Sequence, residues 1–167
     1  MATHVIRTFG DPVLRQRATE VEEVDDALVR LVSDMFDTMY DAPGVGLAAP
    51  QVGVQRRLFV YDIEGGNAPG VVVNPTLSGH RGEWNHDEGC LSVPDLWWPV
   101  TRANEVHLSG WDLAGNELSI DAEELLARVF QHEVDHLDGM LLIERLEPDQ
   151  RKEAMRTLST RAMGLAP

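Results

Sequence analysis

The feature that most constrains this chain is the H-E-x-x-H segment at residues 132–136. Residues four apart lie on one face of an α-helix, so His132 and His136 would present both imidazoles to one divalent cation. Glu133 would lie on the adjacent flank. This arrangement is typical of helices in which two histidines bind a metal and the glutamate transfers a proton.

The surrounding residues have the periodicity of one helix from about residue 122 to 137. At about 100° per residue, Val129 and both histidines fall within roughly 40° of Leu125, which predicts a shared inward face. A capping box at residues 121–124 is expected to begin the helix, and Gly139 is typical of the left-handed residue that closes one.

The other side of this helix is polar. We expect Arg128 at the surface or at the rim of a pocket, and Asp135 and Asp138 as solvated acids. His80 and His86 are expected to face solvent in loops. None of these side chains is predicted to bind a metal.

Two histidines do not complete a hydrolytic metal site, which usually has three protein ligands and one open position. One inward histidine is more often a core residue, and chance matches to H-E-x-x-H occur. Leu142 stands where the extended H-E-x-x-H-x-x-G-x-x-H pattern requires a third histidine. The spacing permits Glu153, but it lies among basic residues. Cys90 is the stronger candidate, because the flanking glycine and proline constrain its backbone.

Composition sets outer limits on structure and function. A chain of 167 residues fits one domain, here taken as residues 1–167. Its formal net charge of −14 disfavours general binding to DNA or to anionic membranes. The single cysteine cannot form an internal disulfide, and no apolar run reaches the roughly 18 residues of a membrane span. We therefore expect a cytoplasmic protein.

The element pattern predicts an α+β fold: small, mostly antiparallel sheets around the central helix, with an N-terminal helix at 25–40 and a C-terminal helix at 148–163. Strands are expected at residues 58–63, 71–73, 82–85, 106–108 and 118–120. Asn74 and Pro75 are expected to end the second strand, with 76–78 resuming at a sheet edge. Residues 112–116 predict a hairpin turn, and the apolar stretch 140–143 is expected to pack on a sheet.

Residues 44–51, G-V-G-L-A-A-P-Q, form a run of small residues that ends on an amide side chain. Its two glycines allow a ligand to approach the backbone closely, although an ordinary tight connection has the same composition.

Three motifs occur in a characteristic order: G-V-G-L-A-A-P-Q at 44–51, E-G-C-L-S at 88–92 and Q-H-E-V-D-H-L-D-G at 131–139. Together with G-D-P-V-L-R at 10–15 and the Asn74-Pro75 pair, they make the chain resemble the bacterial type of the peptide deformylase family. The resemblance covers nearly the whole chain.

The resemblance implies that the metal ligands are Cys90, His132 and His136. Glu133 is then the general base and acid for attack of metal-bound water on a formyl carbon. The resemblance also assigns the stabilisation of the oxyanion to the backbone N–H of Leu91 and the side chain of Gln51.

The same resemblance implies backbone contacts from Val45, Gly46 and Gly89 to a peptide substrate. It also implies an apolar methionine pocket formed by Val45, Leu125 and Val129, a role compatible with core packing.

Four residues in or near these motifs are expected to support the site or the sheet without taking part in the chemistry. We expect a salt bridge between Glu88 and Arg102, which pair in some relatives. Trp97 and Trp98 either shape the substrate groove or cover the sheet.

The implied activity is hydrolysis of the formyl group from the amino-terminal formyl-methionine of new polypeptides, with release of formate. The alternatives are an H-E-x-x-H metallopeptidase, another N-acyl amidohydrolase, or a structural metal site with four protein ligands. The resemblance implies one divalent ion, Fe(II) in the cell, and the ligands also suit zinc, nickel or cobalt.

The expected partners are formyl-methionyl nascent chains and, transiently, the ribosome. Residues 148–167 contain four basic and two acidic side chains, a net charge of +2, so a terminal helix there could contact ribosomal RNA.

Overall fold

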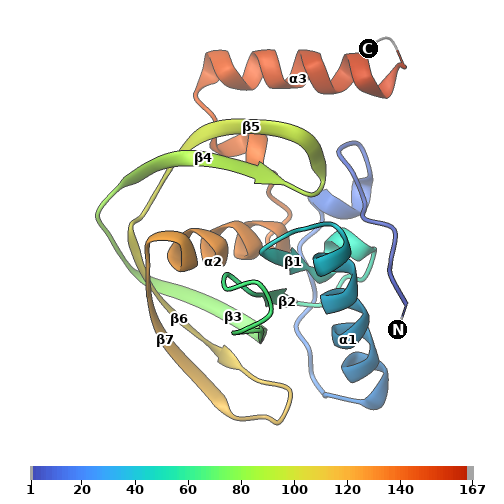
Figure 1. The fold of residues 1–167 in the computed structure, drawn as a ribbon, viewed down its shortest axis with the longest axis vertical. Helices are drawn as coiled ribbons and strands as arrows, with labels where there is room; N and C mark the ends of the chain where they lie inside the picture. The colour runs from blue at the N-terminus through green and yellow to red at the C-terminus, as the bar shows by residue number, and fades with distance from the viewer. Residues whose placement is uncertain (1, 165–167) are drawn as a thin grey trace.

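Helix α2 (Glu124–Leu137) lies between two antiparallel β-sheets (Figure 1). The computed structural model describes residues 2–164. The other helices and strands are α1 (Asp26–Asp41), β1 (Gly46–Ala48), β2 (Leu58–Tyr61), β3 (Gly70–Arg81), β4 (Trp84–Cys90), β5 (Val93–Arg102), β6 (Glu105–Trp111), β7 (Glu117–Glu123) and α3 (Pro148–Ala162). The predicted α+β fold, with its N-terminal, central and C-terminal helices, is confirmed.

The larger sheet has the strand order β1-β2-β3-β6-β7, and the smaller sheet contains β4 and β5. Apolar side chains of the larger sheet and of α2 form one core cluster, in which the ring centroids of Phe59 and Phe130 lie 5.9 Å apart. A second cluster joins α1 to β1 and β2. Figure 1 shows β4 and β5 arching over the opposite side of α2. The histidine-bearing helix is therefore held from both sides.

The predicted capping box of α2 is wrong. Residues 121–123 pair with β6 as the end of β7, and α2 begins at Glu124. Glu124 has a φ of 51°, and its N–H donates to the carbonyl of Asn104 at 2.8 Å. Strand pairing therefore holds the residues that would otherwise form a cap. The helix ends at Leu137 as predicted, and Gly139 has the expected left-handed conformation, with a φ of 75°.

The predicted break at Asn74 and Pro75 is also wrong, because β3 continues through both residues. Residues 70–73 lie between β2 and β6, whereas 76–78 pair with β6 alone, as expected for a sheet edge. The register shifts between Val73 and Thr76, which accommodates a proline that has no N–H to donate. The Asn74 side chain holds the bend by bonding both backbone groups of Val21, at 2.8 and 2.9 Å.

The two strands over α2 are longer than the sequence predicts. A strand was expected at 82–85, whereas β4 extends to Cys90 and pairs along its whole length with β5, for which no strand was expected. The hairpin turn at 112–116 is confirmed, since the N–H of Asp112 donates to the carbonyl of Asn116 at 3.0 Å.

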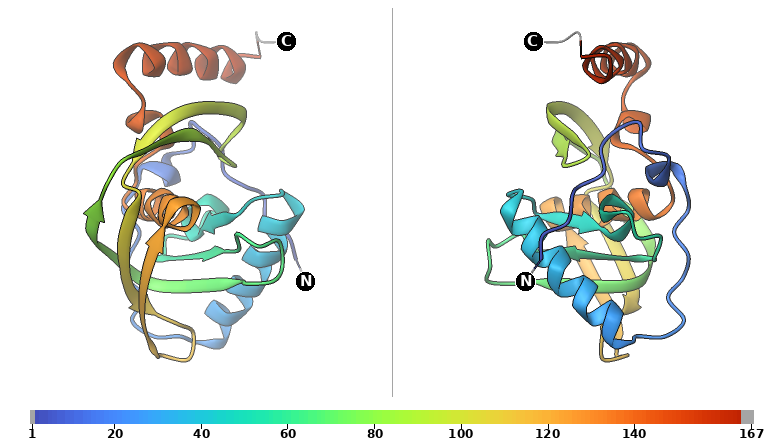
Figure 2. Two further views of the ribbon diagram at one scale, coloured as in Figure 1. Left: turned by 60° about the vertical axis from the view of Figure 1, so that its left-hand side comes forward. Right: turned by 90° about the vertical axis from the view of Figure 1, so that its right-hand side faces the viewer.

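The two outer helices agree with their predicted ranges. The side chain of Asp25 caps α1 by accepting from the N–H of Leu28 at 2.8 Å. α3 buries only Ala154 and Leu158, which pack with the apolar residues following α2 and with β5. Residues 140–143 thus pack against the smaller sheet, as expected. Figure 2 shows α3 at one end of the molecule, beyond that sheet.

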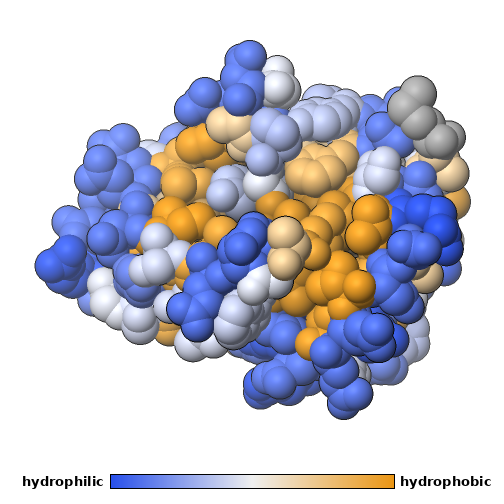
Figure 3. Space-filling model, turned by 90° about the horizontal axis from the view of Figure 1, so that it is seen from below, coloured by the Kyte–Doolittle hydropathy of each residue, from blue (hydrophilic) through white to orange (hydrophobic). Residues whose placement is uncertain are grey.

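The outer surface is mixed in character. Figure 3 shows one face on which hydrophobic residues gather at the centre inside a hydrophilic border. Within residues 2–164, no helix combines the length and apolar character required to span a bilayer.

Candidate metal centre and active site

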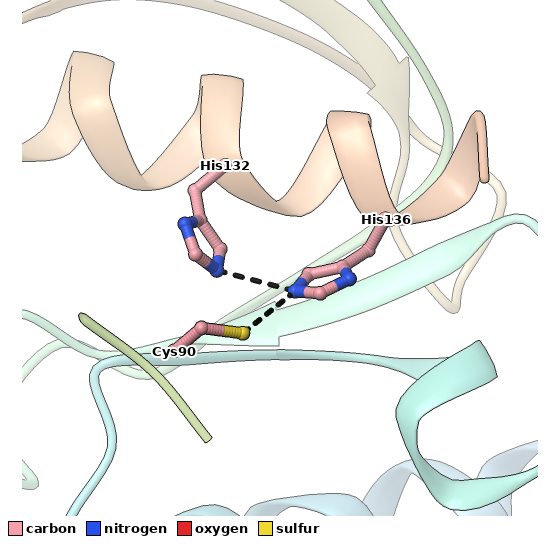
Figure 4. Close-up of side chains that lie close together, drawn as sticks. All are labelled: Cys90, His132 and His136. Carbon is pink, nitrogen blue, oxygen red and sulfur yellow. Dashed lines mark hydrogen bonds between the residues drawn. The ribbon is translucent and has the colours of Figure 1, made fainter. Parts of the chain in front are cut away.

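The three predicted metal ligands converge beside α2, where Cys90 at the end of β4 faces the two histidines of that helix (Figure 4). The Sγ of Cys90 lies 3.2 Å from the Nε2 of His136, which lies 3.2 Å from the Nε2 of His132. All three atoms lie within 4.8 Å of one another, and no other group of this kind occurs among the described residues. Glu153 is exposed on α3 and does not belong to the group.

Each predicted ligand is positioned by its secondary structure. The histidines stand one turn apart on the inward face of α2, whereas Cys90 is the last residue of β4. The β4–β5 register shifts between Gly89 and Cys90. The sulfur accepts the backbone N–H of Ser92 at 3.4 Å. Burial by itself raises the pKa of the Cys90 thiol, but the imidazoles of His136 and His132 hold that pKa well below its ordinary value. The site therefore favours the thiolate, the form that binds metals.

Glu88 connects the smaller sheet to α2. Its buried carboxylate accepts from the Nδ1 of His132 at 2.5 Å, from Arg102 at 2.7 and 2.8 Å, and from Arg128 at 2.7 Å. Burial alone raises the pKa of Glu88, but the hydrogen bonds from Arg102 and His132 hold that pKa well below its usual range. The predicted Glu88–Arg102 salt bridge is confirmed. The contact to His132 was not predicted, and it fixes the ring so that Nε2 points toward the sulfur.

Arg128 and Asp135 are buried, which corrects the expectation of a surface arginine and a solvated acid. Arg128 nevertheless lines the cavity described below, which agrees with its alternative interpretation as a pocket residue. Arg128 pairs with Glu88, and Asp135 pairs with Arg102 at 3.0 Å and with Arg145 at 2.6 and 2.9 Å. The periodicity placed both residues on a polar side correctly, but β4 and β5 cover that side. Charged partners from distant segments offset the desolvation cost of burying these two side chains.

Glu133 lies beside the ligand group with only 3% of its surface exposed, and its Oε2 has no hydrogen-bond partner among the described residues. Burial raises the pKa of its carboxyl to about 7 against the opposing effect of the two imidazoles. A Cβ on Gly46 would lie 2.4 Å from Oε1 of Glu133. The second glycine of the 44–51 motif is thus needed to make room for this carboxylate.

Gln51 is buried on the other side of the sulfur. Its Oε1 accepts the N–H of Ala48 at 2.9 Å, which fixes the amide so that Nε2 faces the cavity. Nε2 then donates to the Oγ of Ser92 at 3.1 Å and lies 3.8 Å from the Sγ of Cys90. The run of small residues is therefore more than a connection: it forms β1 and a 3₁₀ turn that orient an amide toward the ligand group.

A cavity of about 550 Å³ opens beside these residues. Its lining includes the residues predicted to contact substrate, which are Val45, Gly46, Gln51, Gly89, Leu91, Leu125 and Val129. Leu125 and Val129 stand on the same face of α2 as the histidines, as their spacing predicted. The predicted contact residues thus surround one space that also contains Cys90, His132 and Glu133.

The two tryptophans after the cysteine motif differ in environment. Trp97 is exposed and lines the cavity, whereas Trp98 packs against the apolar cluster under α3. His80 and His86 are exposed, as expected, but on β3 and β4 instead of in loops.

Comparison with known proteins identifies the family to which this chain belongs. The polypeptide deformylase family model matches residues 3–152. The chain is a member of the peptide deformylase family. Peptide deformylase from Acidothermus cellulolyticus is 50% identical over 158 residues, covering 95% of this chain and 87% of that protein. Peptide deformylase 1 from Corynebacterium glutamicum is 50% identical over 169 residues, covering 97% of this chain and 98% of that protein.

Solved deformylase structures have the same fold. That from Legionella pneumophila superimposes with a TM-score of 0.91 at 44% identity, covering 99% of this chain and 100% of the other. That from Ehrlichia chaffeensis, in complex with actinonin, gives 0.89 at 36% identity and covers 96% and 98%. Peptide deformylases are metal-dependent hydrolases that remove the formyl group from amino-terminal formyl-methionine of nascent peptides, and the chain is an enzyme of this family.

Proposed function

We propose that this deformylase binds one divalent metal ion through Cys90, His132 and His136 and uses Glu133 for proton transfer. The observation that carries the proposal is the convergence of one sulfur and two imidazole nitrogens at a cavity that also contains a buried carboxylate. The set has three protein ligands, which suits a catalytic site with an open position better than a closed structural site.

The donor atoms fit a divalent ion. The Nδ1 of His132 faces the carboxylate of Glu88, so in the neutral ring Nε2 carries the lone pair. This nitrogen faces the Nε2 of His136 at 3.2 Å, close to the separation of about 3.3 Å expected for two nitrogens bound to one tetrahedral ion. A cation between the rings satisfies both lone pairs and balances the thiolate.

When bound, such an ion supplies Lewis acidity that lowers the pKa of a coordinated water and polarises a carbonyl oxygen. One thiolate and two neutral imidazoles leave it a formal charge of +1, so a nearby base matters more than with three histidines. Glu133 accepts the proton lost by the attacking water. It then delivers that proton to the methionine nitrogen as the C–N bond of the formamide breaks.

Two donors near the sulfur are placed to stabilise the oxygen of the formyl group as it becomes negative. We assign this role to the Nε2 of Gln51 and the backbone N–H of Leu91. Support comes from the fixed orientation of the Gln51 amide and from the position of Leu91 in the short turn after β4.

Val45, Gly46 and Gly89 contribute backbone contacts to the peptide, and Val45, Leu125 and Val129 form the pocket for the methionine side chain. All five residues line the cavity. Burying an unbranched thioether side chain against them contributes about 1.5–3 kcal/mol to binding.

Iron(II) is our choice for the ion in the cell, with zinc, nickel or cobalt as replacements, because thiolate and imidazole ligands accept all four. Residues 1–167 act as one domain. The enzyme works in the cytoplasm, where formylated chains are made, and the basic residues of α3 contact the ribosome.

The test compares formate release from a formyl-methionyl peptide by wild type and Glu133→Gln, with metal content measured in both. Wild type releases formate and contains one ion. Glu133→Gln keeps the ion and loses activity by about 10²–10⁴-fold, the usual contribution of a positioned acid or base. A fully active Glu133→Gln contradicts the role of the carboxylate, and cleavage of internal peptide bonds without formate release indicates a metallopeptidase.

A further inference from the structure

Trp97 has 69% of its surface exposed, unusually high for a side chain of this size. It pairs with Gly89 across the β4–β5 hairpin, and its indole lies over that glycine. A Cβ on Gly89 would lie 2.9 Å from two ring atoms, so any other residue there would displace the indole. The ring therefore reaches across β4 toward the cavity, which both residues line.

The alternation of side chains along β4 determines which of them lie on the same face of the hairpin as Trp97. Successive side chains of a strand point to opposite faces. Glu88 points toward α2, where it contacts two side chains of that helix. Asp87 and Gly89 therefore point to the opposite, outer face, and so does Trp97, which pairs with Gly89.

The place of the second peptide residue follows from the proposed function, in which a formylated peptide lies extended beside Gly89 with its methionine side chain against Leu125 and Val129. Because both of these residues belong to α2, the methionine points toward that helix. The side chain of the second peptide residue then points to the outer face. Gly89 places no side chain between it and the indole of Trp97.

The exposed charged side chains that line the cavity at this position are both acidic. Asp87 and Asp95 line the cavity, both are exposed, and neither forms an ion pair among the described residues. Arg128 also lines the cavity, but it is buried and neutralised by Glu88. An exposed indole face beside an unpaired carboxylate attracts a cation.

We propose that Trp97 and Asp87 form a recognition surface for the second residue of the formylated peptide and that this surface selects lysine or arginine. The aliphatic part of such a side chain covers Gly89, its charged end lies over the indole, and Asp87 supplies the opposite charge. Trp97 is thus a specificity-determining residue outside the metal centre.

The experiment measures kcat/KM for formate release from three formyl-methionyl peptides that differ only in the second residue: lysine, glutamine or glutamate. In wild type we expect lysine to be the best substrate and glutamate the worst. Trp97→Ala lowers the lysine-to-glutamine ratio by about two- to fivefold, the range of an exposed cation–π contact. Trp97→Phe retains part of the ratio, and Asp87→Asn reduces the lysine-to-glutamate ratio.

Trp111→Ala is the matched control, because Trp111 is an exposed tryptophan (42%) on β6 that does not line the cavity. It should leave both ratios unchanged. Equal lysine-to-glutamine ratios in wild type and Trp97→Ala overturn the inference while formate release continues. Absence of formate release from every peptide by metal-loaded wild type contradicts the proposed function instead.

Discussion

Replacing Glu88 with glutamine should destabilise the fold strongly, although Glu88 is outside the ligand group. The wild-type carboxylate is 6% exposed and accepts four hydrogen bonds, two from Arg102 and one each from Arg128 and His132. Without the Glu88 carboxylate, Arg102 still pairs with Asp135. Arg128 then has only backbone carbonyl acceptors and no opposite charge. Leaving one buried charge unpaired costs about 3–5 kcal/mol, and we expect a loss of this size in the free energy of unfolding.

The assay is urea unfolding followed by circular dichroism, with metal affinity measured on the folded protein. Glu88→Gln should also bind the ion about 10–100-fold more weakly, because the carboxylate orients His132 from outside the ligand group. Glu83→Gln makes the same chemical change at an exposed residue just before β4 and should alter stability by less than about 0.5 kcal/mol. If Glu88→Gln unfolds at the same urea concentration as Glu83→Gln, the buried network does not stabilise the protein as argued.

Three further predictions concern single residues. Gly46→Ala should lower kcat by about 10²-fold with metal content unchanged, because its Cβ would displace Glu133; wild-type turnover would contradict this. Asp62 accepts from Tyr40 Oη at 2.7 Å and from two backbone N–H groups, and these bonds lower its pKa against the opposing effect of burial. The Asp62 carboxylate therefore makes its full contribution to the free energy of unfolding above its unfolded-state pKa of about 3.9. That contribution is lost as the pH falls through the lower pKa of the folded state. The stability difference between wild type and Asp62→Asn in urea should accordingly stay constant from neutral pH to about pH 5 and shrink only in stronger acid; a difference that shrinks between pH 7 and 5 would refute it. Gly139→Ala should lower the free energy of unfolding by more than about 1 kcal/mol, since φ is 75° and the new Cβ would lie 2.8 Å from backbone atoms; an unchanged urea midpoint would exclude this strain.

Local patterns in the sequence predicted the parts of the site that depend on a single element. Helical spacing placed His132, His136, Leu125 and Val129 on one inward face, and the structure agrees. The selection of Cys90 over Glu153 depended on backbone constraints around the cysteine and on the family resemblance, because periodicity contains no information about which distant segment meets a helix.

The wrong predictions concern segments whose local structure is determined by pairing with distant parts of the chain. β6 keeps residues 121–123 in a strand, and a register shift carries β3 through Asn74 and Pro75. Arg128 and Asp135 were expected near solvent because nothing adjacent in sequence indicates that a second sheet covers them. Their partners Glu88 and Arg102 lie on β4 and β5, 40 and 33 residues away. Glu88 at the start of the cysteine motif and its predicted pairing with Arg102 were the available signal of a buried network.

The proposed function requires that Cys90, His132 and His136 together hold one divalent ion. The most direct measurement is metal content after anaerobic purification of wild type, Cys90→Ala and His136→Ala, each verified as folded by circular dichroism. We predict one ion per chain in wild type and close to none in either variant. A folded Cys90→Ala that still retains one tightly bound ion per chain would contradict the assignment.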